Sequence, residues 1–231
     1  PYTKRHVVTD ACWLFDGDLA DEGETRAKFA QPGPVRIALP SRLMPWKGVD
    51  DSINALALLG DRVGDYVLDV IGEGPEKKRL IGLCKEHQLD NRVRFHPQIP
   101  YGEPFFRYLR RNHVVLVPTR GLEDVRIAYD AAASGCVILY SKTETLQNSA
   151  GKLPKTWSFE PGNPLSLSEV LAEAFTQRGL WGEAALDGIR SMRGRTMESW
   201  HRCRHEAIEK LWQSRCREQA LKSPVTPGVP G

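Results

Sequence analysis

The chain has 231 residues, of which 41% are hydrophobic and 26% charged, so it is long enough for one large domain or for a domain with appendages. The formal net charge is only +3, which is too small to indicate nucleic-acid binding, and no apolar run approaches the roughly 20 residues that span a bilayer. Residues 181–222 carry the whole surplus, with nine Lys and Arg against six Asp and Glu. Such a basic segment can face an acidic partner or a lipid surface.

Five cysteines are scattered along the chain without a CxxC pair: Cys12, Cys84, Cys136, Cys203 and Cys216. This pattern argues against a disulfide framework or a structural zinc site and favours a reducing compartment. We therefore expect a cytoplasmic protein, with a peripheral membrane contact left open. Because the sequence starts at Pro1 without Met, we interpret it as a piece of a longer protein.

The first 34 residues are interpreted as a lead-in from a preceding domain. They contain one candidate short helix, Glu24–Ala30, and end at Pro32-Gly33-Pro34, a segment that breaks regular secondary structure. From Val35 to about residue 180, short apolar strands alternate with amphipathic helices. The expected strands are Val35–Pro40, Tyr66–Ile71, Arg92–Phe95, His113–Val117, Cys136–Tyr140 and Thr156–Phe159. The expected helices are Asp50–Leu59, Pro75–Leu89, Glu103–Arg111, Ile127–Ser134 and Pro164–Arg178.

This alternation predicts an α/β fold with a parallel sheet over residues 35–180, whose ligand binds beyond the carboxyl ends of the strands. His113–Val117 is apolar throughout, which is typical of a strand in the middle of such a sheet. We expect Asp50 or Asp51 to cap the first of these helices.

Residues 181–222 are expected to form a long C-terminal helix, and residues 223–231 a disordered tail. An apolar stripe runs along the helix at intervals of three and four residues, from Ala185 to Leu211. We interpret it as a surface that packs on its own domain, with a docking surface as the alternative. His201, His205 and Glu209 share a face, which we interpret as solvated and ion-paired rather than as a metal site.

Two cations follow the first strand, where a parallel sheet offers its ligand site. Arg42 and Lys47 lie in Pro40–Gly48 (PSRLMPWKG), between that strand and the first helix. Backbone N–H groups near a helix N-terminus favour anions, and an Arg fork with a Lys point charge suits a diphosphate. The alternative is that both side chains are solvated loop cations.

A glycine pair, Gly72 and Gly74, follows the second strand. It supplies two glycines of a dinucleotide fingerprint without the third, and the fingerprint belongs after the first strand. We therefore interpret it as a tight strand-to-helix turn. An NAD-type oxidoreductase stays a third functional hypothesis, against which both departures argue.

Carboxylates gather after the apolar strand that ends at Val117. The loop 119–125 is expected at the carboxyl edge of the sheet, where Glu123 and Asp124 can reach sugar hydroxyls. Asp130 begins the next helix and can accept hydrogen bonds from a ribose diol. The alternative interpretation is that these acids offset a helix macrodipole.

Five segments, in this order and spacing, carry a resemblance to a known family: Val35–Gly48, Val70–Glu76, Val93–Phe95, Val114–Thr119 and Asp130–Cys136. They resemble the retaining, nucleotide-sugar-dependent glycosyltransferases of the GT-B architecture, in the glycogen-synthase-like group 1 branch. The resemblance implies a Rossmann-like three-layer αβα sandwich with a mostly parallel sheet, plus the long C-terminal helix. It also implies the C-terminal, donor-binding half of such an enzyme.

The resemblance also implies roles for individual residues. Arg42 and Lys47 would bind the donor diphosphate and stabilise the leaving nucleotide without a metal, with Glu123 as the third catalytic residue. Asp130 would take the place of the glutamate that binds ribose. The remaining donor-binding residues would be Ser41, Gly72, Gly74, His96, Pro97, Thr119, Asp124 and Val125. The donor would be a UDP- or GDP-sugar, and no separate cofactor is implied.

Five positions depart from the family pattern, one of them Asp130, which is shorter than the glutamate that it replaces. Leu122 stands where the family has its first glutamate, and Val125 stands where the loop has glycine. Ser41 and His96 also replace glycines. A β-branched Val resists the positive φ that a glycine allows. Leu122, Val125 and the basic final helix motivate a second hypothesis, a catalytically degenerate relative that acts as a binding or scaffolding module.

The leading hypothesis is the nucleotide-sugar-binding half of a retaining enzyme that transfers a hexose-like sugar to an acceptor. Its expected partners are the nucleotide sugar and an N-terminal acceptor-binding domain of the same protein. We expect it not to bind nucleic acid. We expect the 231 residues alone to be inactive.

Overall fold

Six parallel strands form the centre of the structure, a computed structural model that describes residues 13–121 and 126–222, with side chains through residue 213. The strands are β1 (Val35–Pro40), β2 (Tyr66–Ile71), β3 (Val93–His96), β4 (Val114–Val117), β5 (Val137–Ser141) and β6 (Trp157–Phe159). Their order across the sheet is β3-β2-β1-β4-β5-β6, and all neighbouring pairs are parallel. This is the Rossmann order, which confirms the predicted fold class.

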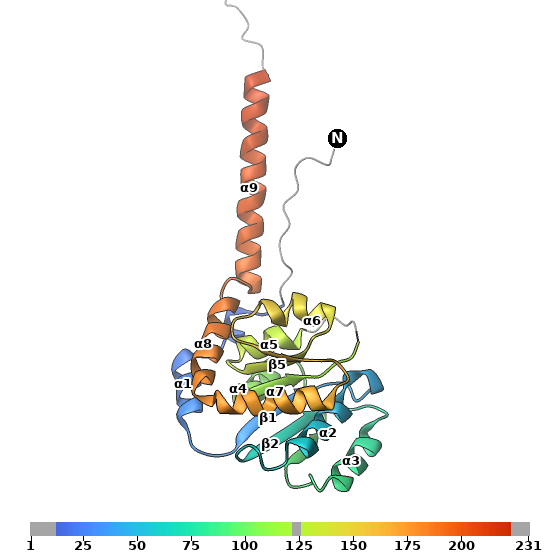
Figure 1. The fold of residues 1–231 in the computed structure, drawn as a ribbon. Coiled ribbons are helices and arrows are strands. Elements are labelled where there is room, and N and C mark those ends of the chain that lie inside the picture. Colours follow the sequence, from blue (N-terminus) through green and yellow to red (C-terminus); the bar gives the residue numbers. More distant parts are fainter. Residues whose placement is uncertain (1–12, 122–125, 223–231) are drawn as a thin grey trace, which may run out of the picture. The chain divides into compact units, whose positions relative to one another are not determined.

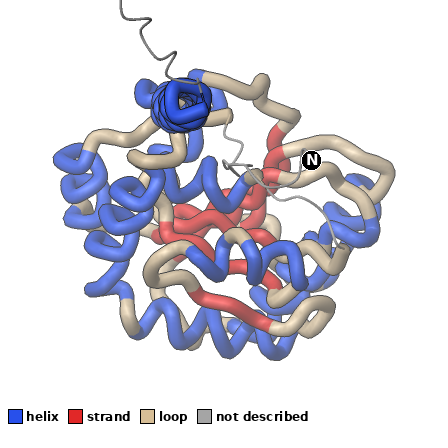
Figure 2. Tube along the Cα trace, turned by 90° about the horizontal axis from the view of Figure 1, so that it is seen from above, coloured by secondary structure: helices blue, strands red, loops and turns tan. Residues whose placement is uncertain are grey.

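Helices lie on both sides of the strands and complete three layers (Figure 2). In the described part of the chain they are α1 (Glu22–Ala30), α2 (Val49–Leu59), α3 (Lys77–Glu86), α4 (Glu103–Arg110), α5 (Ile127–Ala133), α6 (Glu144–Asn148), α7 (Pro164–Thr176), α8 (Trp181–Met192) and α9 (Met197–Lys222) (Figure 1). Short 3-10 turns lie at Asp16–Asp18, Pro45–Lys47, Ala150–Lys152 and Arg178–Leu180. The expected short helix before the first strand is therefore present as α1.

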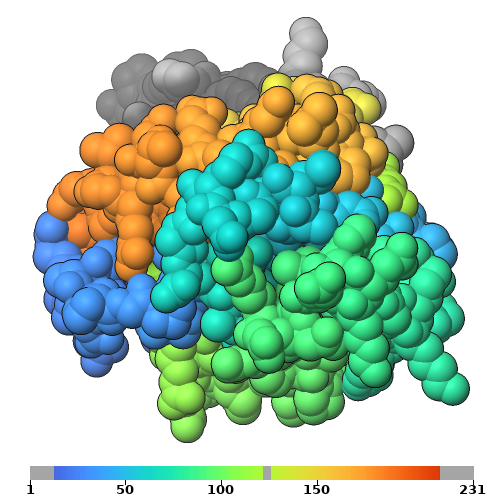
Figure 3. All heavy atoms as spheres, turned by 60° about the horizontal axis from the view of Figure 1, so that its bottom comes forward, coloured from blue at the N-terminus to red at the C-terminus, as the bar shows by residue number. Residues whose placement is uncertain are grey.

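The two faces of the sheet carry different sets of helices. Leu68 and Val70 of β2 share one core with residues of α2, α3 and α7. Asp69 lies between them in sequence, so its side chain points to the opposite face, where it bonds to Tyr108 of α4. On that face α5 packs against α8, and α8 against α1. In Figure 3 the atoms of α1 (blue) adjoin the orange segment that includes α8.

The apolar strand β4 lies between β1 and β5 and is buried along its whole length. Its register places Val114 beside Ile37 of β1 and Val137 of β5. A strand covered on both faces has no solvated side to carry polar residues. The prediction of a central strand here is confirmed.

Helix α2 begins one residue earlier than predicted. Gly48, at φ 67°, is the residue before its first turn, and Asp50 and Asp51 lie within that turn. The prediction that one of these acids caps the helix is wrong. A Cβ on Gly48 would lie 2.1 Å from the carbonyl oxygen of Pro118, so the chain turns at the residue that has none.

The expectation of a single long helix over residues 181–222 is also wrong, because the chain breaks between α8 and α9. The Thr196 side chain accepts a 3.3 Å hydrogen bond from the Ser199 backbone N–H, which caps α9 at its N-terminus. Gly194 precedes the cap and lowers helix propensity at the break. In α8 the stripe residues Ala185, Ile189 and Met192 are buried.

The chain divides into two compact units. One spans Gly17–Arg193, and the other joins, among the described residues, 13–16 with 194–222. Within the second unit, Leu14 pairs with Thr196, and the Met197 N–H donates to the Leu14 carbonyl at 2.6 Å. None of the described helices is long and apolar enough to cross a bilayer.

Candidate functional site

The strand order reverses between β1 and β4, and this point defines the candidate site. Chain connections leave β1 and β4 toward opposite faces of the sheet, which is where open α/β sheets in general have a crevice beyond the carboxyl ends of their strands. The loop Ser41–Gly48 follows β1, and Pro118–Gly121 begins the loop after β4. Ligands of open α/β sheets bind at such switch points.

The loop after β1 is held on one side by the turn after β2. The Ser41 N–H donates to the Ile71 carbonyl, and the Leu43 N–H donates to the Glu73 carbonyl, each at 2.9 Å. A Cβ on Gly72 would lie 2.0 Å from the Ser41 oxygen, and one on Gly74 would lie 2.3 Å from the Leu43 oxygen. This close approach explains both glycines as a tight turn, and their contact with a ligand stays a prediction.

The same loop is held on its other side by Arg120. Its guanidinium forks onto both carboxylate oxygens of Asp51, with Nε to Oδ2 at 2.7 Å. It also donates to the Asp50 carboxylate at 3.0 Å and to the Pro45 carbonyl at 3.1 Å. The backbone N–H of Arg120 adds a bond of 2.8 Å to the Trp46 carbonyl.

Sequence reasoning did not identify Arg120 as part of the site. The available signal was a cation directly after β4, at the switch point, opposite an Asp pair in the first turn of α2. Asp51 is nearly buried, with 5% of its side chain exposed, and a buried carboxylate requires such a partner.

Arg42 and Lys47 therefore lie on a loop that is fixed at both ends. Arg42 is exposed, and its side chain makes no hydrogen bond or ion pair with any residue that the structure describes. Lys47 is half-buried at the end of the turn Pro45–Lys47. The geometry places two cations where an anion can reach a helix N-terminus.

His96 ends β3 and belongs to a hydrogen-bonded trio. Its Nε2 lies 2.8 Å from Oδ1 of Asp69, and the Tyr108 hydroxyl donates to Oδ2 of the same carboxylate at 2.8 Å. Burial, together with the Asp69 hydrogen bond, raises the pKa of Tyr108 well above its usual range. His96 is also linked to the glycine turn, since the Gly72 N–H donates to its carbonyl at 3.1 Å. Pro97 follows at the exposed surface.

Asp130 lies in the first turn of α5 and is buried. The Tyr101 hydroxyl donates to its Oδ1 at 3.1 Å, and burial followed by the Asp130 charge raises the pKa of Tyr101 strongly. The guanidinium of Arg126 lies over the Tyr101 ring, 5.5 Å from its centroid. The phenol contact to Asp130 is a second feature that the sequence pattern did not indicate.

Thr119 is buried, and its hydroxyl donates to the Trp46 carbonyl at 3.3 Å. It thereby joins the loops after β1 and β4. The predicted residues Glu123, Asp124 and Val125 lie outside the described residues, as does Leu122. No cluster of three or more metal-ligating side chains occurs in the described part of the chain.

The structure thus brings most of the predicted residues to one edge of the sheet. The Ser41 N–H donates to the Ile71 carbonyl, and the next residue, Gly72, donates to the carbonyl of His96. Thr119 contacts the loop that bears Arg42 and Lys47. The site has cations, backbone amides and buried carboxylates, which are the groups that bind phosphates and hydroxyls.

A family model described as Glycosyl transferases group 1 matches residues 21–185. The chain belongs to this family. The match includes the first helix and the beginning of α8, up to residue 185, in addition to the segments that carry the resemblance noted in the sequence. A comparison with curated proteins gives no match.

Solved structures share the fold. The C-terminal domain of the group 1 glycosyl transferase LpcC from Francisella tularensis is 18% identical, with a TM-score of 0.63 over 77% of this chain and 94% of that one. HepE (Alr3699) of Anabaena, in complex with UDP and glucose, is 16% identical, with a TM-score of 0.69 over 86% of this chain and 55% of that one. Sucrose-phosphate synthase of Thermosynechococcus elongatus is 19% identical, with a TM-score of 0.67 over 88% of this chain and 52% of that one. The chain thus spans about half the length of the last two proteins.

Proposed function

We propose that this chain is the donor-binding half of a glycosyltransferase that moves a hexose-like sugar from UDP or GDP to an acceptor with retention of configuration. The observation that carries the proposal is the fixed loop Ser41–Gly48 at the switch point of the sheet, with its exposed Arg42 guanidinium. Family membership sets the reaction class. The UDP complexes of HepE support a nucleotide-sugar donor by analogy.

The roles follow from charge development during the reaction. As the sugar–phosphate bond breaks, negative charge builds on the diphosphate, and Arg42 and Lys47 stabilise it. Removing one preorganised donor of this kind costs about 2.7–4 kcal/mol in other enzymes. Asp130 accepts hydrogen bonds from the ribose, and the turn at His96 and Pro97 lies by the base.

The acceptor site belongs to a second domain that packs against this one. The chain spans about half of HepE and of sucrose-phosphate synthase, which supports an N-terminal acceptor-binding partner. The 231 residues alone therefore bind the nucleotide without transferring sugar.

Calorimetric titration with UDP, GDP and ADP tests the proposal. We expect one diphosphate to bind saturably and the affinity to fall about 10- to 100-fold in Arg42→Ala and in Lys47→Ala, because a hydrogen bond to a charged group is worth about 1.5–3 kcal/mol. Lys85→Ala is the matched control, since this exposed lysine lies in the last turn of α3, at the opposite edge of the sheet. Folded protein that binds none of the three nucleotides contradicts the proposal, as does equal binding by Arg42→Ala, Lys47→Ala and wild type.

A further inference from the structure

A second group of cations lies away from the candidate site, where the strands begin rather than end. A surface depression is formed by α1, the start of β1 and the end of α4. Its lining residues are Glu24, Lys28, Gln31, Arg36, Arg110 and Arg111. We call it the basic depression.

The cations of the basic depression are bonded mainly to backbone carbonyls. Lys28 Nζ donates to the carbonyls of Asn112 and Gly135 at 2.8 and 2.7 Å. The Arg36 guanidinium donates to the Arg111 carbonyl. Arg110 donates to the carbonyls of Gly17 and Asp18 at 3.2 and 3.1 Å.

Carbonyl oxygens satisfy these donors without neutralising their charge. The lining holds four cations, and Glu24 is its one carboxylate. Glu103 reaches Arg110 from outside the lining at 3.4 Å. An excess of positive charge therefore remains in a shared, partly desolvated space, where the attraction for an anion is stronger than in water.

Three further observations agree with an uncompensated positive potential. The Nε of Arg110 is buried and has no hydrogen-bond partner among the described residues. Burial, and then the nearby Arg36, lower the pKa of Lys28. The pKa of His113 falls to about 4 through burial and the charges of Arg36 and Lys28.

We propose that the basic depression is a binding site for a phosphate-class oxyanion, distinct from the donor site at the carboxyl edge. Guanidinium groups bind phosphate oxygens in a bidentate manner, and Arg111 makes no side-chain contact with a described residue that would compete. The same chemistry is offered by free phosphate and by a phospholipid headgroup. Binding relieves the repulsion between Lys28 and Arg36.

The first arm of the test titrates inorganic phosphate into the whole chain at constant ionic strength, in an Arg42→Ala/Lys47→Ala background that disables the candidate donor site. We expect saturable binding that weakens at least about fivefold in Arg111→Gln and again in Arg36→Gln, as expected for the loss of about 1 kcal/mol each. Lys85→Gln is the control. Arg111 is exposed, so its variant keeps the fold, which circular dichroism checks.

The second arm separates the two sources of phosphate. Sedimentation with phosphatidylglycerol vesicles, compared with phosphatidylcholine vesicles, measures headgroup binding. Vesicle binding that Arg111→Gln weakens supports the site with a lipid as its source, and phosphate binding without vesicle binding supports it with a free phosphate. If neither phosphate nor vesicle binding depends on Arg111 or Arg36, the proposal is overturned. Loss of nucleotide binding in the Arg42 and Lys47 variants leaves this outcome unaffected, so the two proposals fail separately.

Discussion

Arg120 joins the loop after β4 to the loop after β1 and to the first turn of α2, although it is not itself expected to touch the ligand. It neutralises Asp51 in a nearly buried position. The pair, together with the bond from Arg120 to the Pro45 carbonyl, therefore fixes the loop that bears Lys47.

We predict that Arg120→Gln lowers the free energy of unfolding by about 2–3 kcal/mol, because it leaves the Asp51 carboxylate desolvated and unpaired. Arg120→Lys should cost less, since a point charge is kept but the fork is lost. Urea denaturation measures both. In the double variant with Asp51→Asn the loss should be smaller than the sum of the single losses, and additive losses would contradict the pairing.

His113 makes a pH-dependent contribution to stability. Its Nδ1 accepts the Arg36 backbone N–H at 3.0 Å, and burial with nearby cations lowers its pKa from 6.5 to about 4. As the pH falls below 6.5, His113 becomes protonated in the unfolded chain but stays neutral in the folded chain. The contribution of His113 to the free energy of unfolding therefore decreases between about pH 6.5 and 4 and is constant below pH 4.

We predict that the wild type loses about 2–3 kcal/mol more between pH 7 and pH 4.5 than His113→Asn does, from the size of this shift. Asparagine keeps an acceptor for the Arg36 N–H but does not titrate. Urea denaturation of both proteins at the two pH values gives the difference. Equal losses in the two proteins would show that His113 is not held neutral.

At the level of secondary structure, the break between α8 and α9 depends on a cap. Thr196→Ala removes the side chain that bonds the Ser199 N–H, and loss of such a cap costs about 1 kcal/mol. We predict that amide hydrogen exchange in residues 197–203 speeds up about fivefold. Ser199→Ala, in the same first turn, is the control and should leave exchange unchanged. Equal protection in Thr196→Ala would mean that the cap does not hold the helix end.

The strands were predictable because their pattern is local. Each apolar run is bounded by turn residues, and β4 reads as buried on both faces. The helix ends were less predictable. The start of α2 depends on the approach of Gly48 to Pro118, some 70 residues away in sequence, and no local pattern encodes such a contact.

The candidate site likewise contains residues that the local sequence identified and residues that it did not. Arg42 and Lys47 were identified because their loop follows a strand and precedes a helix. The partners Arg120 for Asp51, Tyr101 for Asp130 and Tyr108 for Asp69 come from other strand–helix units. They become visible only once the strand order places those units side by side.

At the scale of the whole molecule, the sheet order separates two charged regions. The loops after β1 and β4 lie at the carboxyl edge, and the basic depression lies where β1 begins.

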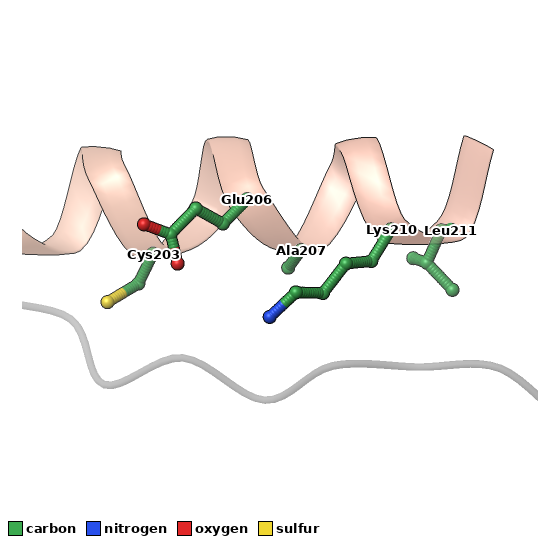
Figure 4. Close-up of a pocket in the computed structure, with 5 residues that line it drawn as sticks. All are labelled: Cys203, Glu206, Ala207, Lys210 and Leu211. Atoms are coloured by element: carbon green, nitrogen blue, oxygen red, sulfur yellow. The ribbon is translucent and has the colours of Figure 1, made fainter. Parts of the chain in front are cut away.

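The five side chains Cys203, Glu206, Ala207, Lys210 and Leu211 project from one side of α9 (Figure 4). Ile208 and Trp212 on the same helix are exposed, and α9 belongs to the other compact unit.

The most direct test of the donor site is an amide NMR titration of the isotope-labelled chain with UDP, GDP and ADP in turn. Glycine amides report on each region: Gly48, Gly72 and Gly74 for the site, and Gly182 and Gly188 for α8. We predict that one diphosphate shifts the first three resonances saturably and leaves those of α8 in place. Shifts confined to α8 or α9, or no shift with any of the three nucleotides, would contradict a donor site at the carboxyl edge of the sheet.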